Sequence, residues 1–178
     1  GDDIALISDA GTPLISDPGY RLVHEARLNG FSVVPIPGAS AVIAALSVSG
    51  LPTDKFRFIG FLPSKSSQRK TVIEALKAVT ETIVCYEAPH RIAKTIEDFS
   101  AIFGSQRLAF MAREITKKFE TYLYGNLRDL LDQVKEDTNQ QRGEIVLVIA
   151  GQEKIGETMP ADSEKLLDCV LIKLLKSS

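Results

Sequence analysis

Residues 4–19, IALISDAGTPLISDPG, decide the fold of this chain. They begin with a continuously apolar run, Ile4 to Ile7, which is typical of a strand covered on both faces of a parallel sheet. A loop rich in Gly, Pro and Asp follows, and Asp17 with Pro18 fits the N-cap and first position of a helix. Gly30 then suits the left-handed residue that ends a helix. The stretch predicts a strand, a loop and a helix.

The same order recurs directly downstream. Residues 32–36 predict a second strand, the loop PGAS follows, and residues 41–49 predict a second helix ended by Gly50. Such units build parallel sheets with right-handed crossovers. Two strands alone would leave bare hydrogen-bonding edges, so we expect further strands, either upstream in a longer protein or from a partner chain.

The pattern changes near residue 54 and predicts about five strands and three helices up to residue 151. The strands are expected at 56–62, 82–87, 106–113, 119–124 and 144–150, and the helices begin near Ser67, Pro89 and Asn126. Polar residues 137–142 predict a mobile connection. The fold class is therefore α/β, with a partial parallel-sheet domain over residues 1–53 and a mixed-sheet domain over 54–151. Residues 152–178 predict a C-terminal extension with an amphipathic helix at about 162–176.

Composition narrows the class of protein. The chain has 178 residues, of which 44% are hydrophobic and 25% charged, as in an ordinary globular protein. A formal net charge of -2 provides no global attraction for nucleic acid, so RNA binding would need a local patch. No apolar run is long enough to span a bilayer, and no signal peptide pattern is present. We expect a cytoplasmic protein that is not in a membrane.

Metal and nucleotide signatures are missing from the sequence. Two distant cysteines, Cys85 and Cys169, argue against a disulfide framework or a thiolate zinc site, and two histidines cannot make a His-rich site. No G-x-G-x-x-G follows a strand, and no P-loop, H-E-x-x-H or G-x-S-x-G motif occurs. We expect neither a metal nor a Rossmann dinucleotide.

Two loops of the first part have the composition of a ligand site, because ligands of open α/β sheets bind at the carboxyl ends of strands. In residues 8–19, Gly11 permits close backbone approach and Asp9 can accept hydrogen bonds from a ribose or an ammonium group. The alternative is a plain turn with two prolines. In residues 37–41, small side chains would admit a flat ligand, or else serve tight helix–sheet packing.

Two loops of the second part carry charged residues. Residues 86–92, YEAPHRI, contain Glu87, His90 and Arg91, which are residue types rarely used for packing. The alternative is that Glu87 caps a helix. Residues 112–120, AREITKKFE, contain Arg113 and Glu114, which could simply pair with each other.

Basic residues gather near these junctions. They are Lys65, Arg69, Lys70, Arg91, Lys94, Arg113, Lys117, Lys118 and Arg142. If they share a face they form a patch that follows a phosphate backbone; otherwise they are scattered solvated charges.

Six ordered motifs carry a family resemblance. They are SDAGTPLISDPG (8–19), PGASAVIAALSVSGLP (37–52), GFLPSKSSQRK (60–70), YEAPHRI (86–92), AREITKKFE (112–120) and RGEIVLVI (142–149). Over about residues 1–151 the chain resembles the ribosomal RNA small-subunit methyltransferase I family. The resemblance implies a tetrapyrrole-methylase-like fold of two α/β domains, in a protein that is a homodimer. It also implies S-adenosylmethionine in the cleft between the domains and methyl transfer to a cytidine 2′-hydroxyl of small ribosomal subunit RNA.

The resemblance also implies which residues hold the cofactor. From the first domain these are Asp9, Ala10, Gly11, Thr12, Pro13, Gly38, Ala39 and Ser40, and from the second they are Tyr86, Glu87, Ala112 and Gly143. The family's first strand with its P-I-G-N loop, and most of its C-terminal extension, have no counterpart in this sequence. We therefore expect an incomplete cofactor cleft, and such a fragment could be inactive.

Methyl transfer needs a ribose oxygen aligned with the sulfonium methyl, exclusion of water, and a base or cation for the forming alkoxide. Candidate bases are Glu87, His90 and Glu114, and candidate phosphate or alkoxide partners are Arg91, Arg113 and Lys117. The sequence does not choose among them. Two alternative functions stay open: a methylase that acts on a tetrapyrrole, and a non-catalytic RNA-binding module.

Overall fold

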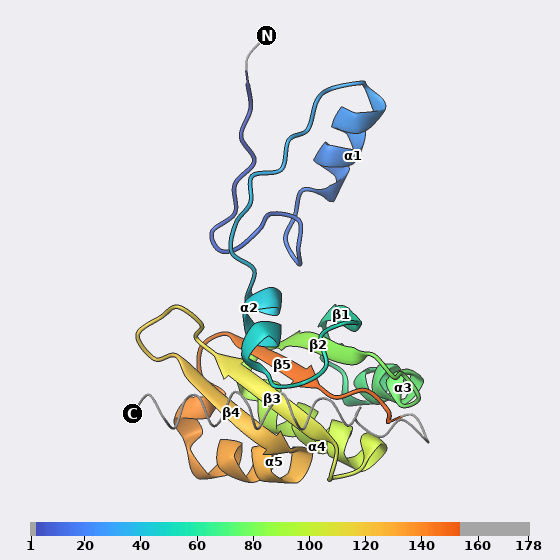
Figure 1. The fold of residues 1–178 in the computed structure, drawn as a ribbon, viewed down its shortest axis with the longest axis vertical. Coiled ribbons are helices and arrows are strands. Elements are labelled where there is room, and N and C mark those ends of the chain that lie inside the picture. The colour runs from blue at the N-terminus through green and yellow to red at the C-terminus, as the bar shows by residue number, and fades with distance from the viewer. Residues whose placement is uncertain (1–2, 154–178) are drawn as a thin grey trace, which may run out of the picture.

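A mixed five-stranded sheet is the centre of the computed structural model, which describes residues 3–153 (Figure 1). The strands are β1 (Phe56–Phe61), β2 (Thr82–Glu87), β3 (Leu108–Arg113), β4 (Thr121–Asn126) and β5 (Ile145–Ile149). Their order in the sheet is β1-β2-β5-β3-β4. β1 and β2 are parallel, whereas the other neighbours are antiparallel. The mixed sheet confirms the predicted α/β fold class.

Helices cover both faces of this sheet (Figure 1). They are α2 (Ala41–Val48), α3 (Ser66–Leu76), α4 (Ile92–Phe103) and α5 (Leu127–Glu136). α1 (Tyr20–Leu28) lies apart from the sheet and has no buried residue, and η1 (Pro89–Arg91) and η2 (Thr138–Gln141) are short 3-10 helices. α3, α4 and α5 bury their apolar faces in one core cluster with the sheet, while α2 packs in a second cluster on the opposite face.

The two clusters follow from strand alternation. Successive side chains of a strand point to opposite faces, so in β2 Ile83 and Cys85 join the cluster of α3 to α5, whereas Val84 and Tyr86 join that of α2. In β3 Met111 lies on the first face and Ala112 on the second. This alternation decides which side of the sheet each candidate residue serves.

Several predicted helix ends are confirmed. Asn126 caps α5, because its Oδ1 accepts hydrogen bonds from the backbone N–H groups of Arg128 (3.0 Å) and Asp129 (2.9 Å). Gly104 follows α4 with φ 91°, and Gly30 lies just beyond α1 with φ 76°. A positive φ is nearly free of strain for glycine, which explains why the chain turns away at these residues.

The predicted start of α1 is wrong. The helix begins at Tyr20 with Gly19 as its N-cap, and neither Asp17 nor Pro18 opens it. Leu14 (φ 73°) and Ser16 (φ 62°) are both in the left-handed region, so the irregular loop continues further than the sequence indicated. The cap expected at Ser67 is also wrong, because α3 already begins at Ser66 after Lys65.

The strands predicted at 4–7 and 32–36 do not form. In the described part of the chain the first strand is β1, and residues 3–40 reach away from the sheet (Figure 1). A strand needs a neighbour to satisfy its backbone N–H and C=O groups, and neither segment has one here. Ile4 is therefore 90% exposed and Ile36 81% exposed.

The polar connection at 137–142 is more regular than expected. It contains η2, in which Gln140 is buried. The Asp137 carboxylate accepts hydrogen bonds from the backbone N–H of Asn139 (3.0 Å) and the side-chain amide of Gln140 (2.9 Å), which replaces the mobile link with a capped turn. The amphipathic helix predicted at 162–176 lies outside the described residues, as does nearly all of the extension at 152–178.

Candidate functional site

The two glycine-containing loops of the first part lie side by side. The Thr12 hydroxyl donates a hydrogen bond to the Ala39 carbonyl at 3.1 Å. Gly11 has φ 73°, and a Cβ on it would lie 3.6 Å from the same carbonyl. The backbone at Gly38 and Ser40 continues this contact into α2. The structure therefore brings the predicted cofactor residues of both loops to one place.

A hollow of about 350 Å³ opens at the first of these loops, and of the predicted cofactor residues Asp9 alone lines it. It is lined by Leu6, Ile7, Ser8, Asp9, Asp17, Pro18 and Gly19. The Ser8 hydroxyl lies 3.1 Å from the Ala10 carbonyl and 3.2 Å from the Gly11 carbonyl, and this contact fixes the turn. Ala10 is exposed, while Pro13 is half-buried against the chain. Two carboxylates, those of Asp9 and Asp17, thus line the hollow beside Gly11.

The candidate residues of the second part gather at one end of the sheet. Glu87, at the end of β2, is opposite Ile145 at the start of β5, and Ile145 is also opposite Arg113 at the end of β3. Gly143 directly precedes this start of β5. The loops that follow β2 and β3 and precede β5 therefore share one edge, as the motifs predicted.

The strand alternation divides these residues between the two faces. Tyr86 and Ala112 belong to the cluster of α2, on the side of the first part of the chain. Glu87 and Arg113 are their neighbours in sequence and so point to the other face, toward α4 and α5. Of the predicted cofactor residues in β2 and β3, Tyr86 and Ala112 are thus placed toward the glycine loops.

Tyr86 lies in a small aromatic cluster at the ends of β1 and β2. Its ring centroid lies 5.1 Å from that of Phe58 and 5.5 Å from that of Phe61. Burial raises the pKa of the Tyr86 hydroxyl, and the negative charges of Asp17 and Glu144 raise it further. A Cβ on Gly60 of β1 would lie 3.7 Å from the Ser16 hydroxyl, so the 8–19 loop approaches this end of the sheet. Neither Phe58 nor Phe61 was predicted, although apolar alternation in FRFIGF could have indicated them.

Glu87 has three hydrogen-bond donors within the protein. Its carboxylate accepts from the Ala88 N–H at 2.7 Å, the Thr95 hydroxyl at 2.6 Å and the Arg91 guanidinium. The Glu87 side chain is buried, and Arg91 is 17% exposed. These contacts hold the turn from β2 into η1 and α4, but neither helix has a side-chain cap hydrogen bond, so the helix-capping alternative is wrong. Thr95, which the sequence did not single out, completes the set.

His90 differs from its neighbours. It is exposed on η1, at the same end of the sheet, and no hydrogen bond or ion pair to it occurs within residues 3–153. A substrate can therefore reach its imidazole without displacing a protein contact.

Arg113 and Glu114 do not pair with each other as the simple alternative expected. Arg113 is 6% exposed, and its guanidinium donates to the Thr121 hydroxyl and the Phe119 carbonyl, both at 2.8 Å. Glu114 accepts from the Glu144 N–H at 2.8 Å. Both side chains therefore hold the loop of residues 114–120 and its neighbour before β5.

Neighbouring groups keep both the Glu114 carboxyl and the Lys117 ammonium in their charged forms. The Glu144 N–H, and then the Lys117 ammonium, hold the pKa of the Glu114 carboxyl below its usual range. Lys117 lies 3.0 Å from Glu144 and 3.1 Å from Glu114. Both carboxylates raise the pKa of the Lys117 ammonium, and Glu144 has the larger effect. A Cβ on Gly143 would lie 2.4 Å from the Glu114 carboxyl carbon, so glycine is needed for this contact. At neutral pH Glu114 is an anion and Lys117 a cation.

Metal ligands and membrane spans give no further candidates. In residues 3–153 no group of three or more His, Cys, Asp or Glu side chains could hold a metal ion. Over that same range no helix is both long and apolar enough to cross a membrane.

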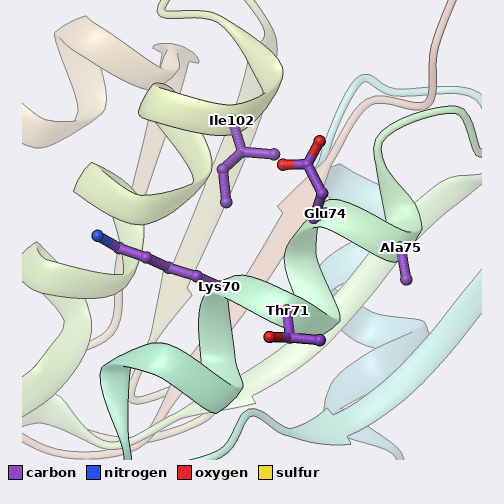
Figure 2. Close-up of a pocket in the computed structure, with 5 residues that line it drawn as sticks. All are labelled: Lys70, Thr71, Glu74, Ala75 and Ile102. Atoms are coloured by element: carbon purple, nitrogen blue, oxygen red, sulfur yellow. The ribbon is translucent and has the colours of Figure 1, made fainter.

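A larger hollow lies elsewhere. It has a volume of about 530 Å³ and opens between α3 and α4, where it is lined by Lys70, Thr71, Glu74, Ala75 and Ile102 (Figure 2). None of the predicted cofactor or catalytic residues lines it. Lys70 lies 3.7 Å from Asp98, so its charge is already paired. The candidate site is therefore the region where the carboxyl ends of β2 and β3 meet the glycine loops.

Known proteins match both the sequence and the fold. The chain is 49% identical to ribosomal RNA small subunit methyltransferase I of Pseudomonas aeruginosa over 176 residues, which cover 98% of this chain and 62% of that protein. It is 54% identical to the protein of that name from Xylella fastidiosa, with 85% of this chain and 55% of the relative covered. These matches confirm the resemblance that the six motifs indicate. The chain spans less than two thirds of the length of these relatives.

Solved structures at low sequence identity share the fold. The methyltransferase CobJ superposes with a TM-score of 0.57 at 17% identity and covers 82% of this chain and 64% of its own. Diphthine synthase superposes with a TM-score of 0.58 at 19% identity, covering 79% and 57%. The family described as Tetrapyrrole (Corrin/Porphyrin) Methylases matches residues 1–131. With the mixed sheet and the convergent loops, this match shows that the chain belongs to the tetrapyrrole methylase family.

Proposed function

We propose that this chain is the catalytic part of an S-adenosylmethionine-dependent methyltransferase that acts on the 2′-hydroxyl of a cytidine in small-subunit ribosomal RNA. The observation that carries the proposal is the contact between the two glycine loops through Thr12 and Ala39, on the side of the sheet where Tyr86 packs in the cluster of α2. The names of the relatives, which identify ribosomal RNA methyltransferases, supply the substrate class.

The residues present suit a sulfonium nucleoside. Gly11 lies against the Ala39 carbonyl, and the hollow of about 350 Å³ lined by Asp9 and Asp17 falls within the usual size of ligand sites. Asp9 and Asp17 would accept hydrogen bonds from a ribose or an ammonium group. Tyr86 and Ala112 would bound the ligand from the sheet. When bound, S-adenosylmethionine supplies a methyl group that is already strongly electrophilic.

The protein's own contribution is positioning and charge. Holding a ribose oxygen in line with the methyl group contributes roughly 7–11 kcal/mol. Among the candidate bases we assign the role to His90, because Glu87 is enclosed by its three donors and Glu114 by Glu144 and Lys117. Arg91 and Arg113 act as positioning residues, and Lys117 adds a fixed cation at the edge.

We infer the setting of the reaction from the family resemblance. The protein works as a cytoplasmic homodimer, and its chemistry requires no metal, because the cofactor itself provides the electrophile. Small ribosomal subunit RNA is the partner macromolecule.

The test combines cofactor binding with methyl transfer. Calorimetry of the chain with S-adenosylmethionine measures the first, and incubation with unmodified small subunits and labelled cofactor measures the second. We expect binding and label in one ribose, which also protects the adjoining phosphodiester bond from alkaline cleavage. Binding without any label in RNA would reject the substrate, and label in an added tetrapyrrole would favour the alternative. His90→Gln should lower transfer while leaving cofactor affinity unchanged.

A further inference from the structure

The structure sorts the nine basic residues of the sequence motifs into three groups. Three are clamps largely enclosed by the protein: Arg69, Arg91 and Arg113. Three are exposed but paired with carboxylates: Lys70, Lys94 and Lys117. The last three, Lys65, Lys118 and Arg142, are exposed and have no ion-pair partner within residues 3–153. An anionic ligand can bind the third group without breaking an existing pair.

These three free cations lie at the same end of the sheet. Lys65 follows β1, Lys118 is in the β3–β4 connection, and Arg142 precedes β5. Because β1 is parallel to β2 while β5 and β4 run opposite to their neighbours, these three connections meet at the edge that carries Glu87 and Arg113. The free cations therefore surround the candidate site instead of being scattered.

A buried arginine holds the backbone next to each free lysine. The Arg69 guanidinium donates to the carbonyl of Ser64, next to Lys65, at 3.3 Å. The Arg113 guanidinium donates to the carbonyl of Phe119, next to Lys118, at 2.8 Å. The Lys118 ammonium also lies 5.6 Å from the centre of the exposed Phe119 ring. The backbone that carries both charges is thus preorganised, which lowers the cost of ordering on binding.

The backbone that follows Arg142, the third free cation, is also held in place. Arg142 precedes Gly143, whose backbone lies against the Glu114 carboxylate, and that carboxylate accepts from the Glu144 N–H. From β1 to β4 the sheet has four strand spacings of about 4.8 Å, or roughly 19 Å in all. At about 3.4 Å per phosphate in a stacked strand, this width matches roughly five or six nucleotides.

We propose that Lys65, Lys118 and Arg142 form a rim that binds the phosphate backbone of a single RNA strand and places one ribose at the candidate site. The inference rests on the proposed function for its substrate class and adds the residues that hold that substrate. Exposed Phe119 provides a ring for base stacking at one end of the rim, as in other single-strand binding surfaces.

The test measures RNA affinity against salt concentration. The probe is a 5′-fluorescein-labelled single-stranded RNA of 16 nucleotides and mixed sequence, followed by anisotropy with the 178-residue chain. Each phosphate contact contributes about 0.7 to the slope of log K against log salt, so the K65Q/K118Q/R142Q variant should lose about two units of slope and bind roughly 50-fold more weakly at about 0.15 M salt.

A matched control uses two other exposed cations. Lys55 and Arg128 also lack ion-pair partners within residues 3–153, but they lie at the opposite end of the sheet, before β1 and after β4. K55Q/R128Q should leave affinity and slope nearly unchanged. Equal loss in this control, an unchanged slope in the rim variant, or no RNA binding by the wild-type chain would overturn the rim. Unchanged melting temperatures show that the variants fold.

Cofactor binding separates the two proposals. Calorimetry with S-adenosylmethionine should give the same affinity for the wild-type chain and the rim variant. If the cofactor binds and methyl transfer occurs but the rim variant behaves as wild type, the rim is rejected while the proposed function stands. If the rim variant loses RNA affinity although no cofactor binds, the rim stands and the proposed function is rejected.

Discussion

The Arg69 guanidinium and the Asp98 carboxylate form a buried ion pair between α3 and α4. Their N–O distance is 2.6 Å, and each side chain is 3% exposed. The same guanidinium reaches the Ser64 carbonyl at 3.3 Å. One buried contact thus joins two helices of the core to the loop that presents Lys65.

Asp98→Asn should destabilise the protein strongly, because it leaves the Arg69 charge buried without its counter-charge. Loss of one partner of such a pair costs about 3–5 kcal/mol, measured as the free energy of unfolding in urea. Glu74→Gln, which removes an exposed carboxylate 3.8 Å from Lys77, is the control and should change it by less than about 0.5 kcal/mol. The R69M/D98L double replacement should recover much of the loss. A D98N protein as stable as wild type would contradict this account.

Thr95→Val should weaken the turn that leads from β2 into α4. The Thr95 hydroxyl donates to the Glu87 carboxylate at 2.6 Å, and both groups are buried. A buried hydrogen bond to a charged group contributes about 1.5–3 kcal/mol, and valine keeps the shape while it removes the donor. Thr95→Ser restores the hydroxyl and should recover most of the free energy of unfolding. If valine and serine cost the same, the hydroxyl would not be the cause.

Gly143→Ala should cost more than the backbone conformation alone explains. Gly143 has φ 78°, and its added Cβ would lie 2.4 Å from the Glu114 carboxyl carbon. Gly30 has φ 76° with nothing within 4 Å of such a Cβ, so Gly30→Ala measures the conformational strain by itself, about 1–2 kcal/mol.

A double-mutant cycle isolates the clash at Gly143. Adding Glu114→Ala removes the side chain that the new Cβ meets, so the two changes together should cost less than their sum when measured by urea unfolding. Strict additivity of G143A and E114A would show that Glu114 does not occupy the space beside Gly143.

The second part of the chain could be predicted well because its signals are local. Asn126 is a side-chain cap, Gly104 a left-handed stop, and the apolar face of α4 repeats at helical spacing. Each of these features depends on residues within a turn or two of one another. The five strands followed from the same kind of pattern, and their convergent ends followed from the motifs.

The first part shows what a local pattern does not settle. Ile4 to Ile7 has the composition of a buried strand, yet a strand forms when another chain segment supplies hydrogen-bond partners. The start of α1 was misplaced because Leu14 and Ser16 adopt left-handed conformations that no propensity indicates. At the site, the sequence grouped Tyr86 with Glu87, whereas the register of β2 sends them to opposite faces.

Thr12→Val should reduce affinity for S-adenosylmethionine if the two glycine loops form its site. The Thr12 hydroxyl is the donor that ties the loops together, at 3.1 Å from the Ala39 carbonyl. Valine has nearly the same shape, so the substitution removes only this bond, which contributes about 1 kcal/mol. Calorimetry should then give a dissociation constant roughly fivefold larger. Thr71→Val removes a comparable hydroxyl in α3 and should not change cofactor affinity. Equal affinities for T12V and wild type would remove this contact from the site.

Glu97→Gln should reveal a pH-dependent link between α4 and α5. The Glu97 carboxylate lies 2.8 Å from Lys135 and 2.9 Å from Lys94, and these two ammonium groups lower its pKa from 4.5 to about 2. A carboxyl whose pKa is depressed on folding stabilises the protein fully above its unfolded pKa and loses this contribution as the pH falls through the folded value.

The wild-type chain should therefore melt about 2–4 °C above E97Q near neutral pH, a small effect because the group is partly solvated. The difference should shrink as the pH is lowered from 4.5 toward about 2, because the carboxylate takes up its proton there. Melting curves of both proteins across this range measure the effect, with E74Q as the control whose difference from wild type stays small throughout. A gap between wild type and E97Q that persists unchanged at pH about 2 would mean that packing, and not the charge of Glu97, links the two helices.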